Sequence, residues 1–290
     1  MCTETGFDSK ALPVFDRRQF ALMTGSAALA ACTGIDTASP DASGLVENPV
    51  VIDTADGDAD GFFVHPAGGK HPGVILWPDI GGLREAKRMM ARRLAEGGYA
   101  VLVVNPYYRD VAGEQFATMS QFRASGGFQT VRDWRAKLSS RAIMRDAGAL
   151  VEWLDGQESV DTTRGIGTQG YCMGGPFTVY SAAARPDRIL AAASFHGGGL
   201  VRDDADSPHR LFARTENTDY LIAIAKDDDA EDPDHDDILL ASARELGVDA
   251  EVEVYAGNHG WCVPDNPSYD EAEAERAWAR LLATYSSALA

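Results

Sequence analysis

The fold of this chain is decided by residues 165–175, which read GIGTQGYCMGG. A strand is predicted over Gly165–Tyr171, and the residues that follow open a predicted helix, so Cys172 stands on a tight strand-to-helix turn. The glycines on both sides of this turn keep it free of steric clashes, as a nucleophile elbow requires. The turn raises the Cys172 thiol above the sheet, and the helix N-terminus favours its thiolate form. A buried structural cysteine in a glycine-rich turn is the alternative interpretation.

The groups that could activate this cysteine follow it in the chain, each directly after a predicted strand. An acid comes from residues 227–229, among which Asp228 has the best spacing from the strand end. A base comes from His259, in the sequence Gly-Asn-His-Gly-Trp. The order nucleophile, acid, base is that of α/β-hydrolases. His259 can deprotonate Cys172, and the aspartate can fix the tautomer of the imidazole ring.

Short β-branched runs alternate with helical stretches from residue 49 onward. Strands are predicted at 50–52, 62–64, 73–77, 99–104, 165–171, 189–195, 220–225 and 251–255. Helices are predicted at 83–96, 141–155 and 270–288, with helical stretches between the later strands. The first two strands form a hairpin. This alternation predicts an α/β-hydrolase fold, with a mainly parallel central sheet and helices on both faces.

An oxyanion hole needs two backbone N–H groups that point at the reacting carbonyl oxygen. One is predicted from Met173, directly after the nucleophile. The other is predicted from Ile80, in the turn Trp-Pro-Asp-Ile-Gly-Gly that follows an earlier strand.

Residues 106–140 interrupt the alternation with aromatic residues among glycines and charged residues. A loop of this length beside a sheet is usually functional, so we expect a lid over a pocket. A surface excursion with its own small apolar cluster is the alternative. Tyr107 of this segment is expected to bind substrate. His196, in Phe-His-Gly-Gly-Gly, is expected to line the same pocket, with a structural turn histidine as the alternative.

Three motifs together resemble the dienelactone hydrolase family: GYCMGG at 170–175, PDIGGLR at 78–84 and GNHGW at 257–261. The resemblance covers roughly residues 50–288. It implies hydrolysis of an ester or lactone, for which the family's typical substrate is a dienelactone, without a cofactor. It also implies that Cys172, Asp228 and His259 form a catalytic triad.

The same resemblance suggests two groups that bind substrate. Asp79 stands where the family has a glutamate that contacts the cysteine. Arg109 matches an arginine that binds the substrate carboxylate. A second family arginine is absent, since Trp-Cys-Val occupies the matching positions 261–263. The resemblance therefore implies the reaction class rather than the dienelactone itself.

The composition excludes other functions. Lys plus Arg number 26 against 44 for Asp plus Glu, a net charge of −18 that disfavours nucleic-acid binding. No metal site is predicted, because the acidic run at 227–237 lacks the glycine of a calcium loop and no Cys/His cluster has zinc-ligand spacing. Four cysteines are too few for a disulfide scaffold. In an exported protein, a disulfide between Cys172 and Cys262 would be a minor alternative state.

The N-terminus resembles an export signal. Arg17-Arg18 precedes a weakly apolar run at 21–31, and the run ends at Cys32 in a lipobox-like context. We expect a twin-arginine-type signal peptide over 1–31, lipidation at Cys32 and a flexible linker over 32–48. The domain at 49–290 would then be periplasmic or anchored to the bacterial envelope. A short amphipathic helix in a cytoplasmic protein is the alternative.

Two rival functions remain open at this stage. A non-catalytic, envelope-associated binding lipoprotein could use the same fold, because fold does not determine function. A thioesterase or acyltransferase could use the same three residues. The sequence does not define the oligomeric state.

Overall fold

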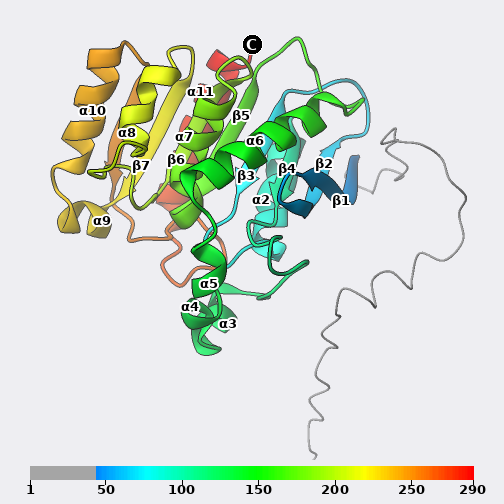
Figure 1. Ribbon diagram of the computed structural model, residues 1–290, viewed down its shortest axis with the longest axis horizontal. Coiled ribbons are helices and arrows are strands. Elements are labelled where there is room, and N and C mark those ends of the chain that lie inside the picture. Colours follow the sequence, from blue (N-terminus) through cyan, green and yellow to red (C-terminus); the bar gives the residue numbers. More distant parts are fainter. Residues whose placement is uncertain (1–43) are drawn as a thin grey trace, which may run out of the picture. The chain divides into compact units, whose positions relative to one another are not determined.

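An eight-stranded sheet forms the centre of the part of the chain that the computed structural model describes, residues 44–290 (Figure 1). Its strand order is β1-β2-β4-β3-β5-β6-β7-β8. The strands are β1 (Leu45–Thr54), β2 (Gly57–Pro66), β3 (Gly73–Trp77), β4 (Ala100–Val104), β5 (Ile166–Tyr171), β6 (Ile189–Phe195), β7 (Asp219–Ala225) and β8 (Ala250–Tyr255). β2 pairs antiparallel with β1 and β4, whereas the other neighbours pair in parallel. The predicted hairpin, mainly parallel sheet and α/β-hydrolase fold are confirmed.

The expected signal peptide over 1–31 and the lipidation site at Cys32 lie outside the described residues. The expected linker over 32–48 is too long at its C-terminal end. β1 begins at Leu45, which is buried and pairs with Pro66. The domain therefore begins before residue 49, because β1 is fixed by its pairing with β2 rather than by local hydrophobicity.

Helices cover both faces of this sheet, as Figure 1 shows. They are α2 (Glu85–Glu96), α6 (Ser140–Asp155), α7 (Gly175–Ala184), α8 (Pro208–Leu211), α9 (Lys226–Glu231), α10 (His235–Leu246) and α11 (Glu271–Ala288). Leu150 of α6, Val179 of α7 and Leu239 of α10 belong to the core on one face. Leu94 of α2 and Leu281 of α11 belong to the core on the other.

Three short helices occupy the segment predicted as a lid. They are α3 (Met119–Ala124), α4 (Gly127–Thr130) and α5 (Arg132–Arg135). Their apolar residues form a separate cluster around Phe122, as the surface-excursion alternative predicted. The same cluster includes Ile80 and packs against Met173, so the segment lies against the predicted oxyanion residues. Closure over a pocket stays a prediction.

No helix within residues 44–290 is long and apolar enough to cross a membrane.

Candidate active site

Cys172 stands on a strained turn between β5 and α7. Its φ is +53°, in the left-handed region that non-glycine residues rarely occupy. A Cβ at Gly170 would lie 2.0 Å from the carbonyl oxygen of Gly174, so the turn excludes a side chain at Gly170. A Cβ at Gly174 would lie 2.6 Å from the carbonyl oxygen of Trp77 at the end of β3. The two glycines therefore allow the tight elbow and its close approach to the neighbouring strand. The Cys172 side chain stays partly exposed.

The His259 ring meets a carboxylate from the end of β7. Its Nδ1–H can donate to Asp228, whose Oδ2 lies at 2.8 Å and Oδ1 at 3.0 Å. Asp227 binds the backbone of the loop rather than the ring: its Oδ1 accepts a hydrogen bond from the backbone N–H of His259 at 2.7 Å. Among the three acids at 227–229, the ring is thus oriented by Asp228 and the loop is fixed by Asp227.

The environment of His259 favours its protonated form. Burial opposes the imidazolium, but the hydrogen bonds with Asp228 and Cys172, and the charges of these two groups, outweigh burial and raise the pKa of His259 to about 10. Because Nδ1 of His259 faces Asp228, Nε2 is the ring nitrogen available to the Cys172 sulfur. The side chains of His259 and Asp228 are 35% and 33% exposed, so water and a small substrate can reach them.

Tyr107 joins the two predicted oxyanion residues. Its hydroxyl donates to the carbonyl oxygen of Ile80 at 2.8 Å and lies 3.5 Å from Sδ of Met173. Burial raises the pKa of Tyr107 well above its usual range, so this hydroxyl remains a donor. Tyr107 is only 1% exposed, and its hydroxyl contacts protein groups. Its expected contact with substrate stays a prediction.

Asp79 lies in a buried ionic cluster. Its oxygens pair with Arg84 at 2.7 Å and Lys87 at 2.9 Å, and all three residues are buried. Asp265 completes the cluster at 2.7 Å from Arg84. Burial would raise the pKa of Asp79, but Lys87 and Arg84 hold it well below its usual range. Both carboxylate oxygens of Asp79 are thus paired with cations, and its expected contact with substrate stays a prediction.

Arg109 is also engaged elsewhere. Its guanidinium pairs with Asp146 of α6 and with Asp56 of the β1–β2 hairpin, each at 2.7 Å. Its side chain is 9% exposed. Two acids distant in sequence therefore pair with Arg109, and its expected binding of a substrate carboxylate stays a prediction.

His196 lies beneath the His259 ring. The ring centroids are 4.7 Å apart with an edge-on geometry, and Trp261 packs on the other side at 5.3 Å. His196 is 1% exposed, and burial together with the nearby His259 lowers its pKa well below its usual range. The buried, neutral ring of His196 packs against His259, and its expected contact with substrate stays a prediction.

Cys172 and Cys262 are both free thiols in the structure. Burial raises the pKa of Cys262 to about 12, so this thiol is a poor nucleophile. Within residues 44–290, no three His, Cys, Asp or Glu side chains are grouped in a way that could hold a metal ion.

Sequence reasoning missed the anchoring residues around the site. Arg84 and Lys87 stand one helical turn apart directly after the PDIGG turn. This spacing could have indicated that both cations pair with a nearby acid. Asp227 was considered only as a rival to Asp228. No local signal pointed to Asp265, which lies 181 residues from Arg84.

Comparison with known proteins identifies the family of this chain. The model of the dienelactone hydrolase family matches residues 59–289. A Methylorubrum extorquens protein provisionally named carboxymethylenebutenolidase is 27% identical, over 84% of this chain and 82% of its own. The carboxymethylenebutenolidase of Rhodococcus opacus is also 27% identical, over 71% of this chain and 77% of its own.

A solved structure supports the fold. A Klebsiella pneumoniae protein, provisionally described as a dienelactone hydrolase, superposes with a TM-score of 0.70 at 22% identity, covering 84% of this chain and 99% of that one. The resemblance that the three sequence motifs indicated is confirmed: the chain is a hydrolase that belongs to the dienelactone hydrolase family.

Proposed function

We propose that this protein hydrolyses a small carboxylic ester or lactone through an acyl-enzyme on Cys172. The single observation that carries the proposal is the hydrogen bond between Asp228 and His259, together with the strained elbow that carries Cys172 and the influence of Cys172 on the pKa of His259. Nucleophile, base and orienting acid in hydrogen-bond reach are the arrangement of covalent acyl transfer. The related proteins named carboxymethylenebutenolidases support a lactone or ester as the substrate class.

In the first half-reaction the Cys172 sulfur attacks the carbonyl carbon, and the carbonyl oxygen takes the electron pair. As the sulfur attacks, His259 takes the proton of Cys172. The raised pKa of His259 makes its ring a strong proton acceptor. When the tetrahedral intermediate collapses, the C–O bond of the ester breaks, and His259 gives its proton to the leaving alkoxide oxygen. The products are a thioester on Cys172 and an alcohol, which in a lactone stays attached to the acyl group.

In the second half-reaction, neutral His259 takes a proton from water, and the hydroxide attacks the thioester carbonyl. The carbon–sulfur bond then breaks, which releases the carboxylic acid and returns the sulfur to its pair with His259. In both steps the backbone N–H groups of Ile80 and Met173 would stabilise the oxyanion. The contact of Tyr107 with both residues supports this pairing.

The surroundings favour an uncharged substrate. The guanidinium of Arg109, the expected carboxylate ligand, is neutralised by Asp56 and Asp146. The chain also carries a net charge of −18, which repels anions. We therefore infer that a neutral ester or lactone is hydrolysed faster than an anionic dienelactone of similar size.

The test compares Cys172→Ala with wild type on 4-nitrophenyl acetate and on a panel of lactones. We expect Cys172→Ala to lose hydrolysis while keeping its circular dichroism spectrum, and Cys172→Ser to be weak because serine needs stronger base catalysis. The matched control is Cys262→Ala, which removes the other described thiol and should stay active. Full activity of Cys172→Ala would refute the nucleophile.

Two further measurements separate the rival functions. Mass spectrometry of wild type quenched during turnover should find the acyl group on Cys172, whereas a non-catalytic binding protein would show no such adduct. Product analysis with an added alcohol distinguishes hydrolysis from acyl transfer to the alcohol. We expect the free acid as the main product.

We also propose export and lipid attachment at Cys32, on the sequence pattern described above. In a bacterial host with a twin-arginine system, replacing Arg17 and Arg18 by lysine should leave the protein in the cytoplasm. Cys32→Ser should abolish incorporation of labelled palmitate. Unchanged fractionation and labelling would contradict this proposal.

A further inference from the structure

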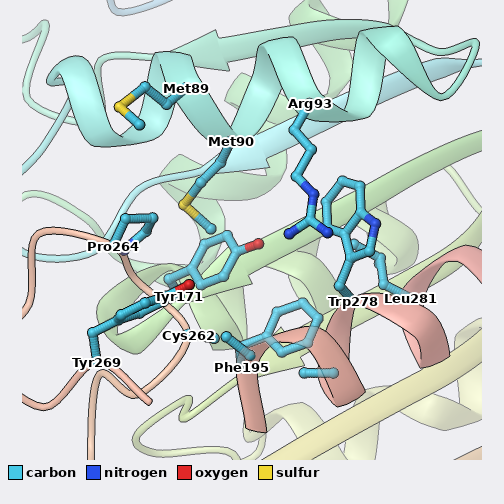
Figure 2. Close-up of a pocket in the computed structure, with 12 residues that line it drawn as sticks. Met89, Met90, Arg93, Tyr171, Phe195, Cys262, Pro264, Tyr269, Trp278 and Leu281 are labelled. Atoms are coloured by element: carbon cyan, nitrogen blue, oxygen red, sulfur yellow. The ribbon is translucent and has the colours of Figure 1, made fainter. Parts of the chain in front are cut away.

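A cavity lies between α2, α11 and the loop that follows Trp261 (Figure 2). Its volume is about 240 Å³. Tyr171 and Phe195 form its floor at the ends of β5 and β6, and Cys262 lies beside them. Cys172, Asp228 and His259 do not line it. The cavity is therefore a separate space behind the elbow, in the core between the sheet and the α2–α11 face.

The walls of this cavity are apolar and adaptable. Met90 points from α2 toward Tyr171, and Trp278 and Leu281 face it from α11 (Figure 2). Methionine side chains fit ligands of varied shape because they are unbranched and polarisable. Met89 and Tyr269 at the rim are 52% and 40% exposed, so apolar surface continues from the cavity to solvent. Contiguous apolar surface that is exposed to solvent often marks a binding site.

The one cationic side chain on the wall, Arg93, is already paired. Its two terminal nitrogens donate to Glu275 at 2.7 and 2.6 Å, and its guanidinium lies 4.2 Å from the centre of the Trp278 ring. Its charge is thus neutralised, and the net charge of −18 also disfavours an anion. The buried hydroxyl of Tyr171 accepts a hydrogen bond from Gln169. The cavity therefore suits an uncharged ligand.

Volume sets the size of that ligand. An apolar cavity of about 150 Å³ holds benzene, so a space of about 240 Å³ corresponds to two fused rings. Aromatic rings also match the faces of Trp278, Phe195 and Tyr171. We propose that this cavity is a binding site for one uncharged bicyclic aromatic molecule, distinct from the substrate site at Cys172.

The test is calorimetric titration of the full chain with 1-naphthol. We expect saturable binding of one molecule per chain, unchanged in Cys172→Ala and in protein whose Cys172 has been alkylated with iodoacetamide. Ala274→Leu fills the cavity from α11 and should weaken binding about ten-fold, which is about 1.4 kcal/mol, because overfilling a packed space is unfavourable. Ala279→Leu, on the exposed side of the same helix, should bind as wild type does.

Met90→Phe fills the cavity from α2 and should weaken the binding of 1-naphthol in the same way. This variant provides the test if Ala274→Leu fails to fold. The proposal is overturned if wild type shows no saturable binding, if both cavity variants bind normally, or if alkylation of Cys172 removes binding. Because binding is measured without turnover, failure here is distinguishable from failure of the proposed hydrolase activity.

Discussion

The hydroxyl of Tyr107 lies 2.8 Å from the carbonyl oxygen of Ile80 and 3.5 Å from the sulfur of Met173. One buried side chain of the 106–140 segment thus holds two turns that come from different parts of the chain. Those turns carry the N–H groups proposed for the oxyanion. The segment therefore contributes to the site by fixing backbone positions, whatever its role in covering substrate.

Tyr107→Phe should lower kcat on 4-nitrophenyl acetate about ten-fold and change KM less. The substitution leaves the Ile80 carbonyl without its partner and loosens the turn, and a loss of about 1–3 kcal/mol is usual for an orphaned buried acceptor. The control is Tyr108→Phe, which removes a buried hydroxyl that donates to Asp146 at 2.6 Å, away from the oxyanion turns. Equal effects on kcat for the two variants would argue against this role.

Exchanging each acid of the 227–229 trio for asparagine should give three different results. Asp228→Asn loses the acceptor that fixes the His259 tautomer, and we expect kcat to fall about 10²-fold to 10⁴-fold. Asp227→Asn weakens the anchor of the His259 backbone and should have a smaller effect. Asp229→Asn is the matched control and should stay near wild type. Steady-state kinetics at neutral pH measure kcat for the three variants. The predicted ranking is wrong if Asp229→Asn loses the most kcat.

Local pattern predicted the strands, the elbow and the order of the three proposed catalytic residues. This worked because each of these residues directly follows a strand of a parallel sheet, and the carboxyl ends of parallel strands meet at one edge. Asp228 was chosen by its spacing from the end of β7, and its carboxylate does face His259.

Long-range pairing explains what the pattern missed. The family resemblance implies that Arg109 binds a substrate carboxylate, but no local pattern shows that Asp56 and Asp146, 53 and 37 residues away, pair with it. The resemblance likewise implies a role for Asp79 at the cysteine, but it does not show that Arg84 and Lys87 pair with Asp79. Ion pairs of this kind depend on how elements pack, and a single sequence does not show that.

The charge of His259 should make stability depend on pH. Its pKa rises from an ordinary 6.5 to about 10 in the folded protein. A raised pKa means that the folded state binds the proton more tightly, so the stabilisation is complete below pH 6.5 and is lost as the pH rises through about 10. Urea unfolding from about pH 6 to about pH 10 should show the advantage of wild type over His259→Gln shrinking steadily. An advantage that grows with pH would contradict the assignment.

The buried cluster of Asp79, Arg84 and Lys87 should be sensitive to the loss of one partner. Arg84→Met removes a cation that pairs with both Asp79 and Asp265. Removing one partner of a buried ion pair lowers the free energy of unfolding by about 3–5 kcal/mol. A loss of that size is a large part of the stability of an ordinary domain. Urea unfolding at neutral pH measures it.

Arg88→Met is the matched control for that substitution. Arg88 stands one turn further along α2, and its pair with Glu114 at 2.7 Å is partly exposed, with side chains 22% and 32% accessible. Partly exposed pairs contribute about 0–1 kcal/mol to the free energy of unfolding. The Arg88→Met variant should therefore have nearly the same free energy of unfolding as wild type. Similar small losses for both variants would mean that the Asp79 turn is held by its backbone hydrogen bonds alone, and the case for the cluster as the anchor of the Ile80 turn would fail.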